Sequence, residues 1–211
     1  MRLAVLLSGN GQTLQAIIEA QKCGHLHAEI ACVISDRSDA YGLVRAQQAN
    51  IATAVIARAQ FDNKVDFEQA LIDTLTSAGV ELVVLAGFMR VLSPHFISHF
   101  AGRILNIHPS LLPKFKGLNT HQRAIDAGEQ EHGTSVHFVD ESLDGGAVIL
   151  QAKVPIFPED SLADVEQRVK QQEQHIYPLV ISWFAQGRLV FSPPYAVLDG
   201  NVLGASGYAS D

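Results

Sequence analysis

The chain has 211 residues, of which 47% are hydrophobic and 18% are charged, a composition that is typical of a folded globular protein and excludes a disordered one. A formal net charge of −7 argues against a protein that mainly binds a nucleic-acid backbone, because such binding needs clustered lysine and arginine. Two cysteines, Cys23 and Cys32, are too few for a disulfide framework and are spaced wrongly for a redox or zinc pair. The apolar runs are too short for a signal peptide or a membrane span, so we expect a cytoplasmic protein.

Strand-like and helical patterns alternate along the first half of the chain. Apolar runs at residues 3–7, 30–34 and 82–86 show no polar alternation, which indicates strands that are buried on both faces. Helical patterns lie between these runs, at residues 14–20, 42–49 and 65–78. Repeated units of this kind predict an α/β fold with a doubly wound, mostly parallel sheet and helices on both faces. The ligands of such a fold bind at the carboxyl ends of its strands.

The second half begins with a strand and continues with a hairpin. A predicted strand at residues 103–107 runs into a loop with two prolines, which forbid regular structure there. Residues 134–139 and 147–154 flank an Asp-Gly-Gly turn at residues 144–146, and this pattern predicts a β-hairpin. We therefore expect the sheet to contain an antiparallel portion in its C-terminal half.

A long helical pattern and a polar tail end the chain. Ser161 and Asp164 resemble a capping box, which predicts the start of this helix. Pro178 is expected to kink the helix or to lie near a break in it. Residues 201–211 are small and polar, and we expect them to form a loosely ordered tail. The sequence contains no internal repeat or linker, so we predict a single domain over residues 1–211.

The first candidate site is the loop SGNGQT at residues 8–13, between the first predicted strand and the first predicted helix. Its glycines allow close backbone approach, and the start of a helix offers unpaired N–H groups that suit a phosphate. Leu14 takes the place of the third glycine of a dinucleotide-binding fingerprint, and no Walker lysine follows. A mononucleotide is therefore favoured over NAD. The alternative is a tight turn that needs glycine only for its dihedral angles.

The second candidate site combines a strand end with the hairpin turn. Asn106 and His108 are two residues apart on a strand, so their amide and imidazole point to the same side and can hold an oxyanion. Asp144 lies at the tip of the predicted hairpin, where its carboxylate can keep an imidazole charged. Two simpler interpretations remain open, namely that His108 is a structural histidine and that Asp144 is only a turn residue.

The segments NIHPSLLPKFKG and HGTSVHFVDESLDGGAVI closely resemble the folate-dependent formyltransferase family, and SGNGQTLQAII, LAGFMRVLSP and QEQHIYPLVISWFAQGRL extend the resemblance over nearly the whole chain. The resemblance implies transfer of a formyl group from 10-formyltetrahydrofolate to the amine of glycinamide ribonucleotide, in de novo purine biosynthesis. It implies that Asn106, His108 and Asp144 are catalytic and that no metal is required. Residues 1–100 would then be the nucleotide-binding half, and residues 101–200 the catalytic and folate-binding half.

The resemblance also implies which residues contact the two small molecules. For the nucleotide, they are Gly11, Gln12 and Thr13 at the phosphate and Lys170 and Glu173 near the ribose. For the folate, they are Lys64, Met89, Arg90, Val91, Leu92, Asn106, Asp140, Glu141, Ser142, Leu143 and Asp144, with Phe88, Ile97 and Ile104 as apolar walls. Lys170 stands where the family more often has a glutamine, and Lys64 stands where it more often has an arginine. Lysine at position 64 keeps the charge but not the bidentate geometry.

Three other functions share parts of this pattern. A formyltransferase that acts on methionyl-tRNA would use the same catalytic residues, but the acidic charge of this chain argues against a large polyanion as substrate. A formyltetrahydrofolate hydrolase shares the same core and carries an additional N-terminal regulatory domain. A nucleotide-binding module without catalysis would leave Asn106, His108 and Asp144 unexplained. We therefore expect two small-molecule substrates, no nucleic acid, no membrane, and a monomer or a weak homodimer.

Overall fold

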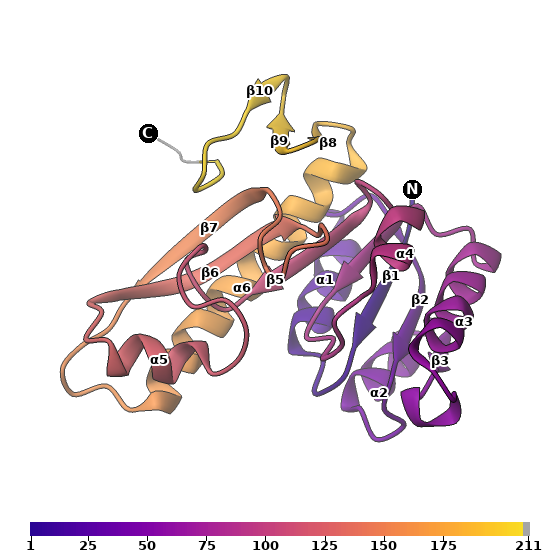
Figure 1. The fold of residues 1–211 in the computed structure, drawn as a ribbon, viewed down its shortest axis with the longest axis horizontal. Coiled ribbons are helices and arrows are strands. Elements are labelled where there is room, and N and C mark those ends of the chain that lie inside the picture. Colours follow the sequence, from indigo (N-terminus) through magenta and orange to yellow (C-terminus); the bar gives the residue numbers. More distant parts are fainter. Residues whose placement is uncertain (209–211) are drawn as a thin grey trace. The chain divides into compact units, whose positions relative to one another are not determined.

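A computed structural model describes residues 1–208, and the chain divides into two compact units, Met1–Leu105 and Asn106–Asp211. In the first unit strands and helices alternate as the sequence predicts (Figure 1). Its elements are β1 (Arg2–Leu7), α1 (Gln12–Lys22), β2 (Glu29–Ser35), α2 (Tyr41–Gln48), β3 (Thr53–Val55), the short helix η1 (Arg58–Gln60), α3 (Lys64–Ser77), β4 (Leu82–Leu85) and α4 (Pro94–His99).

The boundary between the two units falls within strand β5 (Ile104–His108). Two strands and a long helix dominate the second unit. Its elements are α5 (Thr120–Asp126), β6 (Glu131–Phe138), β7 (Val148–Pro155), α6 (Leu162–Ala185), β8 (Leu189–Ser192), β9 (Tyr195–Leu198) and β10 (Asn201–Val202).

The strands of the described residues form two sheets. The larger sheet has seven strands in the order β3-β2-β1-β4-β5-β6-β7, and the smaller has three in the order β10-β9-β8. β1 runs parallel to β2 and β4, and β2 runs parallel to β3, whereas β6 and β7 are antiparallel. The predicted α/β class is thus confirmed, with a mostly parallel sheet and an antiparallel portion in the second half.

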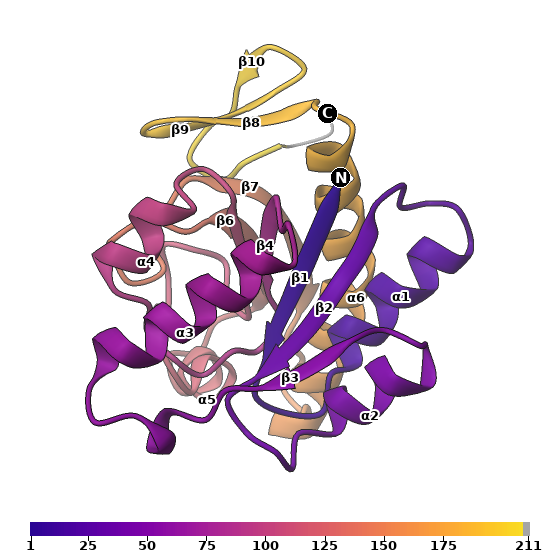
Figure 2. The same cartoon turned by 90° about the vertical axis from the view of Figure 1, so that its right-hand side faces the viewer.

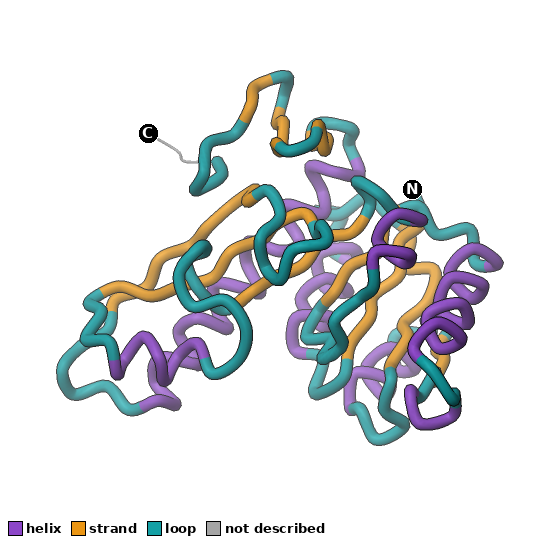
Figure 3. The backbone as a smooth tube through the Cα atoms, viewed as in Figure 1, coloured by secondary structure: helices purple, strands orange, loops and turns teal. Residues whose placement is uncertain are grey.

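Apolar strands without polar alternation form the centre of the first unit. The side chains of residues 3–7 in β1 are completely buried. Figure 2 shows α1 and α2 on one side of β1, β2 and β3, and α3 and α4 on the other. The segments that follow β1, β2 and β4 at their carboxyl ends are loops or turns (Figure 3). Because parallel strands end at the same edge of a sheet, side chains in these loops gather at that edge.

The long helix α6 of the second unit begins at the predicted capping box. The backbone N–H of Asp164 donates to the hydroxyl of Ser161, and the carboxylate of Asp164 accepts from the backbone N–H of Ser161. The helix continues past Pro178 to Ala185, so no break occurs there. The buried side chains of Tyr177 and Val180 on either side of this proline hold the helix through packing that outweighs the lost backbone hydrogen bond. Neither α6 nor any other helix in residues 1–208 is long and apolar enough to cross a membrane.

The sequence did not predict the small sheet after α6. β8 pairs with β9, and β9 pairs with β10, so part of the segment expected to be a loose tail belongs to a sheet. Tyr208 donates its backbone N–H to the carbonyl of Ile149 at 2.7 Å. The last residues of that expected tail, 209–211, lie outside the described part of the chain.

Candidate active site

His108 and Asp144 lie close together in the second unit. His108 is the last residue of β5, and its Nδ1 lies 3.5 Å from Oδ2 of Asp144. The imidazole is 7% exposed and the carboxylate 12%, so water screens their interaction only weakly. Asp144 also accepts a hydrogen bond from the backbone N–H of Gly117 at 2.9 Å. A positively charged imidazole at position 108 would thus meet a carboxylate that the backbone already holds in place.

The other ring nitrogen of His108 faces a backbone carbonyl. Its Nε2 lies 3.0 Å from the carbonyl oxygen of Phe115, and a carbonyl can only accept, so Nε2 carries a proton. Phe115 has a left-handed φ of 52°, a conformation that is uncommon outside glycine. Both ring nitrogens of His108 therefore face hydrogen-bond acceptors, a carbonyl on one side and a carboxylate on the other.

Asn106 joins this cluster through His137, a histidine that the sequence-based hypothesis did not include. Nδ2 of Asn106 lies 3.2 Å from Nε2 of His137, and that nitrogen lies 4.0 Å from Oδ1 of Asp144. Burial is the main cause that lowers the pKa of His137, so its imidazole is neutral. Its Nδ1 lies 2.8 Å from the carbonyl of Phe138 and must donate, which leaves Nε2 as an acceptor for the amide of Asn106.

The loop between β6 and β7 contains the predicted folate contacts of the second unit. These are Asp140, Glu141, Ser142, Leu143 and Asp144. Asp140 accepts hydrogen bonds from the backbone N–H and the hydroxyl of Ser142, and Asp144 has a left-handed φ of 46°. A Cβ on Gly146 would lie 1.9 Å from a carbonyl oxygen of β6, so only glycine fits there. The turn that places the Asp144 carboxylate therefore has a fixed shape, while Leu143 remains 56% exposed.

Glu173 on α6 is connected to His108 through one threonine. A side-chain hydrogen bond joins Glu173 to Thr134, and the hydroxyl of Thr134 donates to the carbonyl of His108 at 2.9 Å. Burial raises the pKa of Glu173 to about 7, although the exposed Lys170 and Thr134 act in the opposite direction. Glu173 can therefore change its charge near neutral pH.

Two more histidines form a pair in the same unit. Nδ1 of His121 lies 3.1 Å from Nε2 of His132. Burial lowers the pKa of both side chains to about 4, and the charge of Lys170 adds to the effect on His121. Within residues 1–208 no group of three or more His, Cys, Asp or Glu side chains is placed to hold a metal ion. The pair is therefore neutral at physiological pH and joined by a hydrogen bond.

In the first unit, the predicted phosphate residues lie at the start of α1. Gly11 is the N-cap with a left-handed φ of 75°, Gln12 and Thr13 follow it in the helix, and no side chain caps the first turn. The first backbone N–H groups of α1 therefore lack a capping partner that would compete with an anion. Arg45 of α2 fixes the preceding residue, because it donates to the carbonyl oxygen and to Oδ1 of Asn10 at 2.9 and 2.8 Å.

Gly11 also has a structural role that needs no ligand. A Cβ at this position would lie 2.6 Å from the Cα of Gly42 in α2. Together with the positive φ, this contact explains the glycine by packing alone. A tight turn is therefore enough to explain the glycine at position 11. The argument for a bound phosphate depends instead on the first backbone N–H groups of α1, which no side chain caps.

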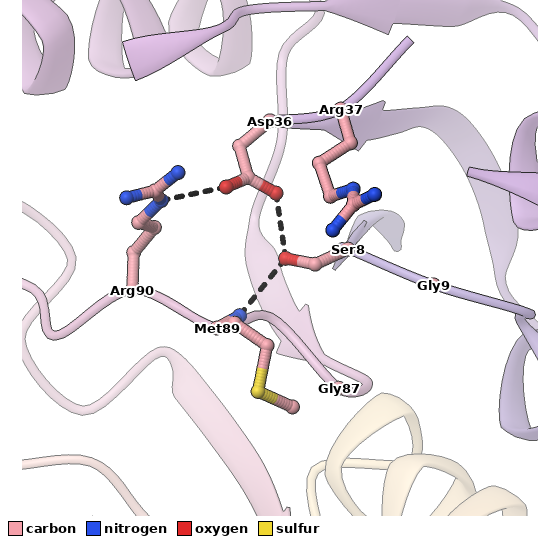
Figure 4. Close-up of a pocket in the computed structure, with 7 residues that line it drawn as sticks. All are labelled: Ser8, Gly9, Asp36, Arg37, Gly87, Met89 and Arg90. Carbon is pink, nitrogen blue, oxygen red and sulfur yellow. Dashed lines mark hydrogen bonds and ion pairs between the residues drawn. The ribbon is translucent and has the colours of Figure 1, made fainter. Parts of the chain in front are cut away.

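Four predicted folate residues of the first unit, 89–92, lie in the loop from β4 to α4. Met89 and Val91 are 65% and 68% exposed, whereas Leu92 is buried. A pocket of about 330 Å³ lies beside this loop (Figure 4). It is lined by Ser8, Gly9, Asp36, Arg37, Gly87, Met89 and Arg90. Lys64 begins α3, and its Nζ lies 3.7 Å from a carboxylate oxygen of Glu68. The lysine therefore forms one ion pair there.

The sequence-based hypothesis did not include Asp36, His137 and Phe115, and it placed Ser8 only in the candidate phosphate loop. Ser8 and Asp36 each follow a buried strand directly, and that position was a usable signal because strand ends gather at one edge of the sheet. His137 lies on the strand that leads into the turn of Asp144, a weaker signal. No sequence signal marks Phe115, because its contribution comes from a backbone carbonyl.

The sequence and the fold match those of a known family of enzymes. The chain belongs to the formyl transferase family, whose model matches residues 1–181. The phosphoribosylglycinamide formyltransferase of Haemophilus influenzae is 59% identical over 210 residues, which cover 100% of this chain and 99% of the relative. The protein of that name from Escherichia coli is 54% identical over 211 residues, 100% of both chains. The solved structure of the Coxiella burnetii phosphoribosylglycinamide formyltransferase has a TM-score of 0.95 and 52% identity, and the match covers 99% of this chain and 98% of that one.

Proposed function

We propose that the chain transfers the formyl group of 10-formyltetrahydrofolate to the amine of glycinamide ribonucleotide. The products are formylglycinamide ribonucleotide and tetrahydrofolate, and the reaction belongs to de novo purine biosynthesis. The observation that carries the proposal is the cluster of Asn106, His108 and Asp144 in a chain that matches a phosphoribosylglycinamide formyltransferase from end to end. Membership of the formyl transferase family supports the folate as donor, and the names of the full-length relatives support the acceptor.

The reaction needs hydrogen-bond donors at the formyl oxygen. The amine attacks the formyl carbon, and the oxygen becomes negatively charged. The C=O bond then forms again as the bond to the folate nitrogen breaks, and the proton that the amine loses passes to that nitrogen. Asn106 and protonated His108 donate to the oxyanion, which stabilises the transition state. Because Asp144 faces Nδ1 of His108, Nε2 is the donor that turns to the substrate. The formyl oxygen then takes the place that the carbonyl of Phe115 occupies beside Nε2.

The binding residues belong to the same proposal. The start of α1 at Gly11, Gln12 and Thr13 receives the phosphate, since its first turn has no side-chain cap. Glu173, with Lys170 nearby, accepts hydrogen bonds from the ribose hydroxyls. The folate lies against Met89, Arg90, Val91 and Leu92, against the loop of Asp140, Glu141, Ser142, Leu143 and Asp144, and near Asn106 and Lys64. We further propose one functional domain, a monomer or weak homodimer, and the cytoplasm as its location.

One assay tests the proposal and its rivals together. Purified protein is mixed with 10-formyltetrahydrofolate and glycinamide ribonucleotide, and the absorbance of released tetrahydrofolate is followed. We expect release that depends on the ribonucleotide. Release without any acceptor would indicate a hydrolase, and faster release with methionyl-tRNA would reverse the choice of acceptor. Binding of both compounds without release would leave only a binding module.

A further inference from the structure

The segment from residue 86 to residue 93 joins β4 to α4 without regular structure (Figure 3). It exposes two apolar side chains, Met89 and Val91, at 65% and 68%. A loop of this kind loses conformational entropy when it is held in one shape, so the shape requires specific contacts. Two buried carboxylates provide them.

The first carboxylate is Asp36, whose side chain is 2% exposed at the carboxyl end of β2. It accepts hydrogen bonds from the hydroxyl of Ser8 and from Nε of Arg90, both at 2.6 Å. The oxygen of Ser8 in turn accepts the backbone N–H of Met89 at 2.9 Å. Figure 4 shows Asp36 between Ser8 and Arg90, with Met89 joined to it through Ser8. One carboxylate thus fixes the backbone at Met89 and the side chain at Arg90.

The second carboxylate is Glu68, whose side chain is 1% exposed on α3. It accepts the backbone N–H of Ser93 at 2.8 Å and also the hydroxyl of Ser93. Ser93 is the N-cap of α4 and ends the segment. Glu68 therefore holds the far end of the same loop.

A buried carboxylate is not explained by stability alone, because an apolar side chain of similar size often stabilises the folded state as well or better. Here both carboxylates act on a single segment, and this segment is the one that the proposed function assigns to the folate. We propose that Asp36 and Glu68 are positioning residues that hold the backbone of residues 89–93 in the shape that meets the folate. This inference rests on the proposed function.

Asp36→Asn tests the first anchor. Asparagine keeps the size of the side chain and can still accept from Ser8, but it loses the charged interaction with Arg90. We expect the KM for 10-formyltetrahydrofolate to rise about tenfold, equivalent to ~1.4 kcal/mol, while kcat at saturating folate and the KM for the ribonucleotide stay within about twofold. Asp39→Asn is the control, because Asp39 is an exposed neighbour that pairs with Arg37 at 2.9 Å and should change neither KM.

Ser8→Ala and Glu68→Gln carry the same test if Asp36→Asn does not fold. Each removes one contact to the segment, and each should raise the folate KM selectively, by roughly threefold to tenfold. A structural role alone would lower the melting temperature and leave the two KM values in their wild-type ratio, and that result would overturn the inference. Calorimetry with tetrahydrofolate separates the two proposals. If the wild type does not bind it, the proposed function fails, whereas equal affinity in wild type and variants refutes only the positioning role.

Discussion

Asp144→Asn is the sharpest test of the catalytic cluster, because the structure makes asparagine a conservative probe at this position. Asp144 has a left-handed φ of 46°, and asparagine is among the few residues that tolerate this conformation. Its side-chain oxygen can still accept the backbone N–H of Gly117, which Asp144 now accepts at 2.9 Å. The substitution therefore removes the charge and leaves the turn intact.

The expected size of the effect follows from the distance to His108. At 3.5 Å and an effective dielectric constant of about 20, a carboxylate and an imidazolium attract each other by about 5 kcal/mol before desolvation is subtracted. Loss of one preorganised contact to a transition state commonly costs about 10²–10³ in rate, or roughly 3–4 kcal/mol. We expect kcat to fall by that factor while both KM values change little.

The assay is steady-state release of tetrahydrofolate at neutral pH, with Asp126→Asn at the exposed end of α5 as the control. The double variant Asp144→Asn with His108→Ala should lose little more than either single variant, because residues that act as a unit are not additive. If Asp144→Asn kept more than about a third of the wild-type kcat, equivalent to under ~0.7 kcal/mol, the cluster would not work as proposed and Asp144 would be a turn residue.

Three further predictions concern the nucleotide site and stability. Arg45→Met should release Asn10 and raise the KM for glycinamide ribonucleotide about tenfold, or ~1.4 kcal/mol. The folate KM should not change in the same assay. Equal changes in both KM values would argue against a phosphate at the start of α1. Because the pKa of Glu173 is about 7, the ribonucleotide KM should fall as the pH rises through 7, and a Glu173→Gln variant that kept this dependence would contradict the role of Glu173. His121 and His132, with pKa values of about 4 instead of 6.5, take up protons only when the chain unfolds. The free energy of unfolding should therefore drop as the pH falls from 6.5 toward 4, by up to ~1.4 kcal/mol per pH unit for each histidine. We expect the free energy of unfolding of His121→Asn, measured with urea at several pH values, to depend less steeply on pH than that of the wild type. An unchanged pH dependence would disprove the assignment.

The fold was most predictable where burial and periodicity agree. The apolar run at residues 3–7 became β1 (Arg2–Leu7), and the helical pattern at 65–78 became α3 (Lys64–Ser77). Short elements were missed, because α4 and α5 have too few turns to establish a period. The Ser93-Pro94 start of α4 was a usable signal, since serine at the N-cap and proline at the first position both favour a helix.

The candidate site was predictable where the local pattern of a single strand or turn indicates the place of a residue. Asn106 and His108 follow from the alternation of a strand, and Asp144 from a turn rich in glycine. His137 and Asp36 were not found, because each meets its partners only after strands distant in sequence come together. Such pairing depends on the order of strands in the sheet, which local patterns do not encode.

The hydrogen bond between His137 and the carbonyl of Phe138 has a consequence for the atoms of Asn106. Because Nδ1 of His137 must donate there, Nε2 has only a lone pair to offer, and Asn106 can satisfy it only with its nitrogen. The amide cannot turn over without bringing two acceptors face to face. The second N–H of the Asn106 amide therefore keeps one direction. It can donate a hydrogen bond to an acceptor such as a carbonyl oxygen, but it repels the hydrogen of another donor. A single backbone carbonyl thus sets the polarity of a side chain that it does not touch, through the proton position on a neutral imidazole.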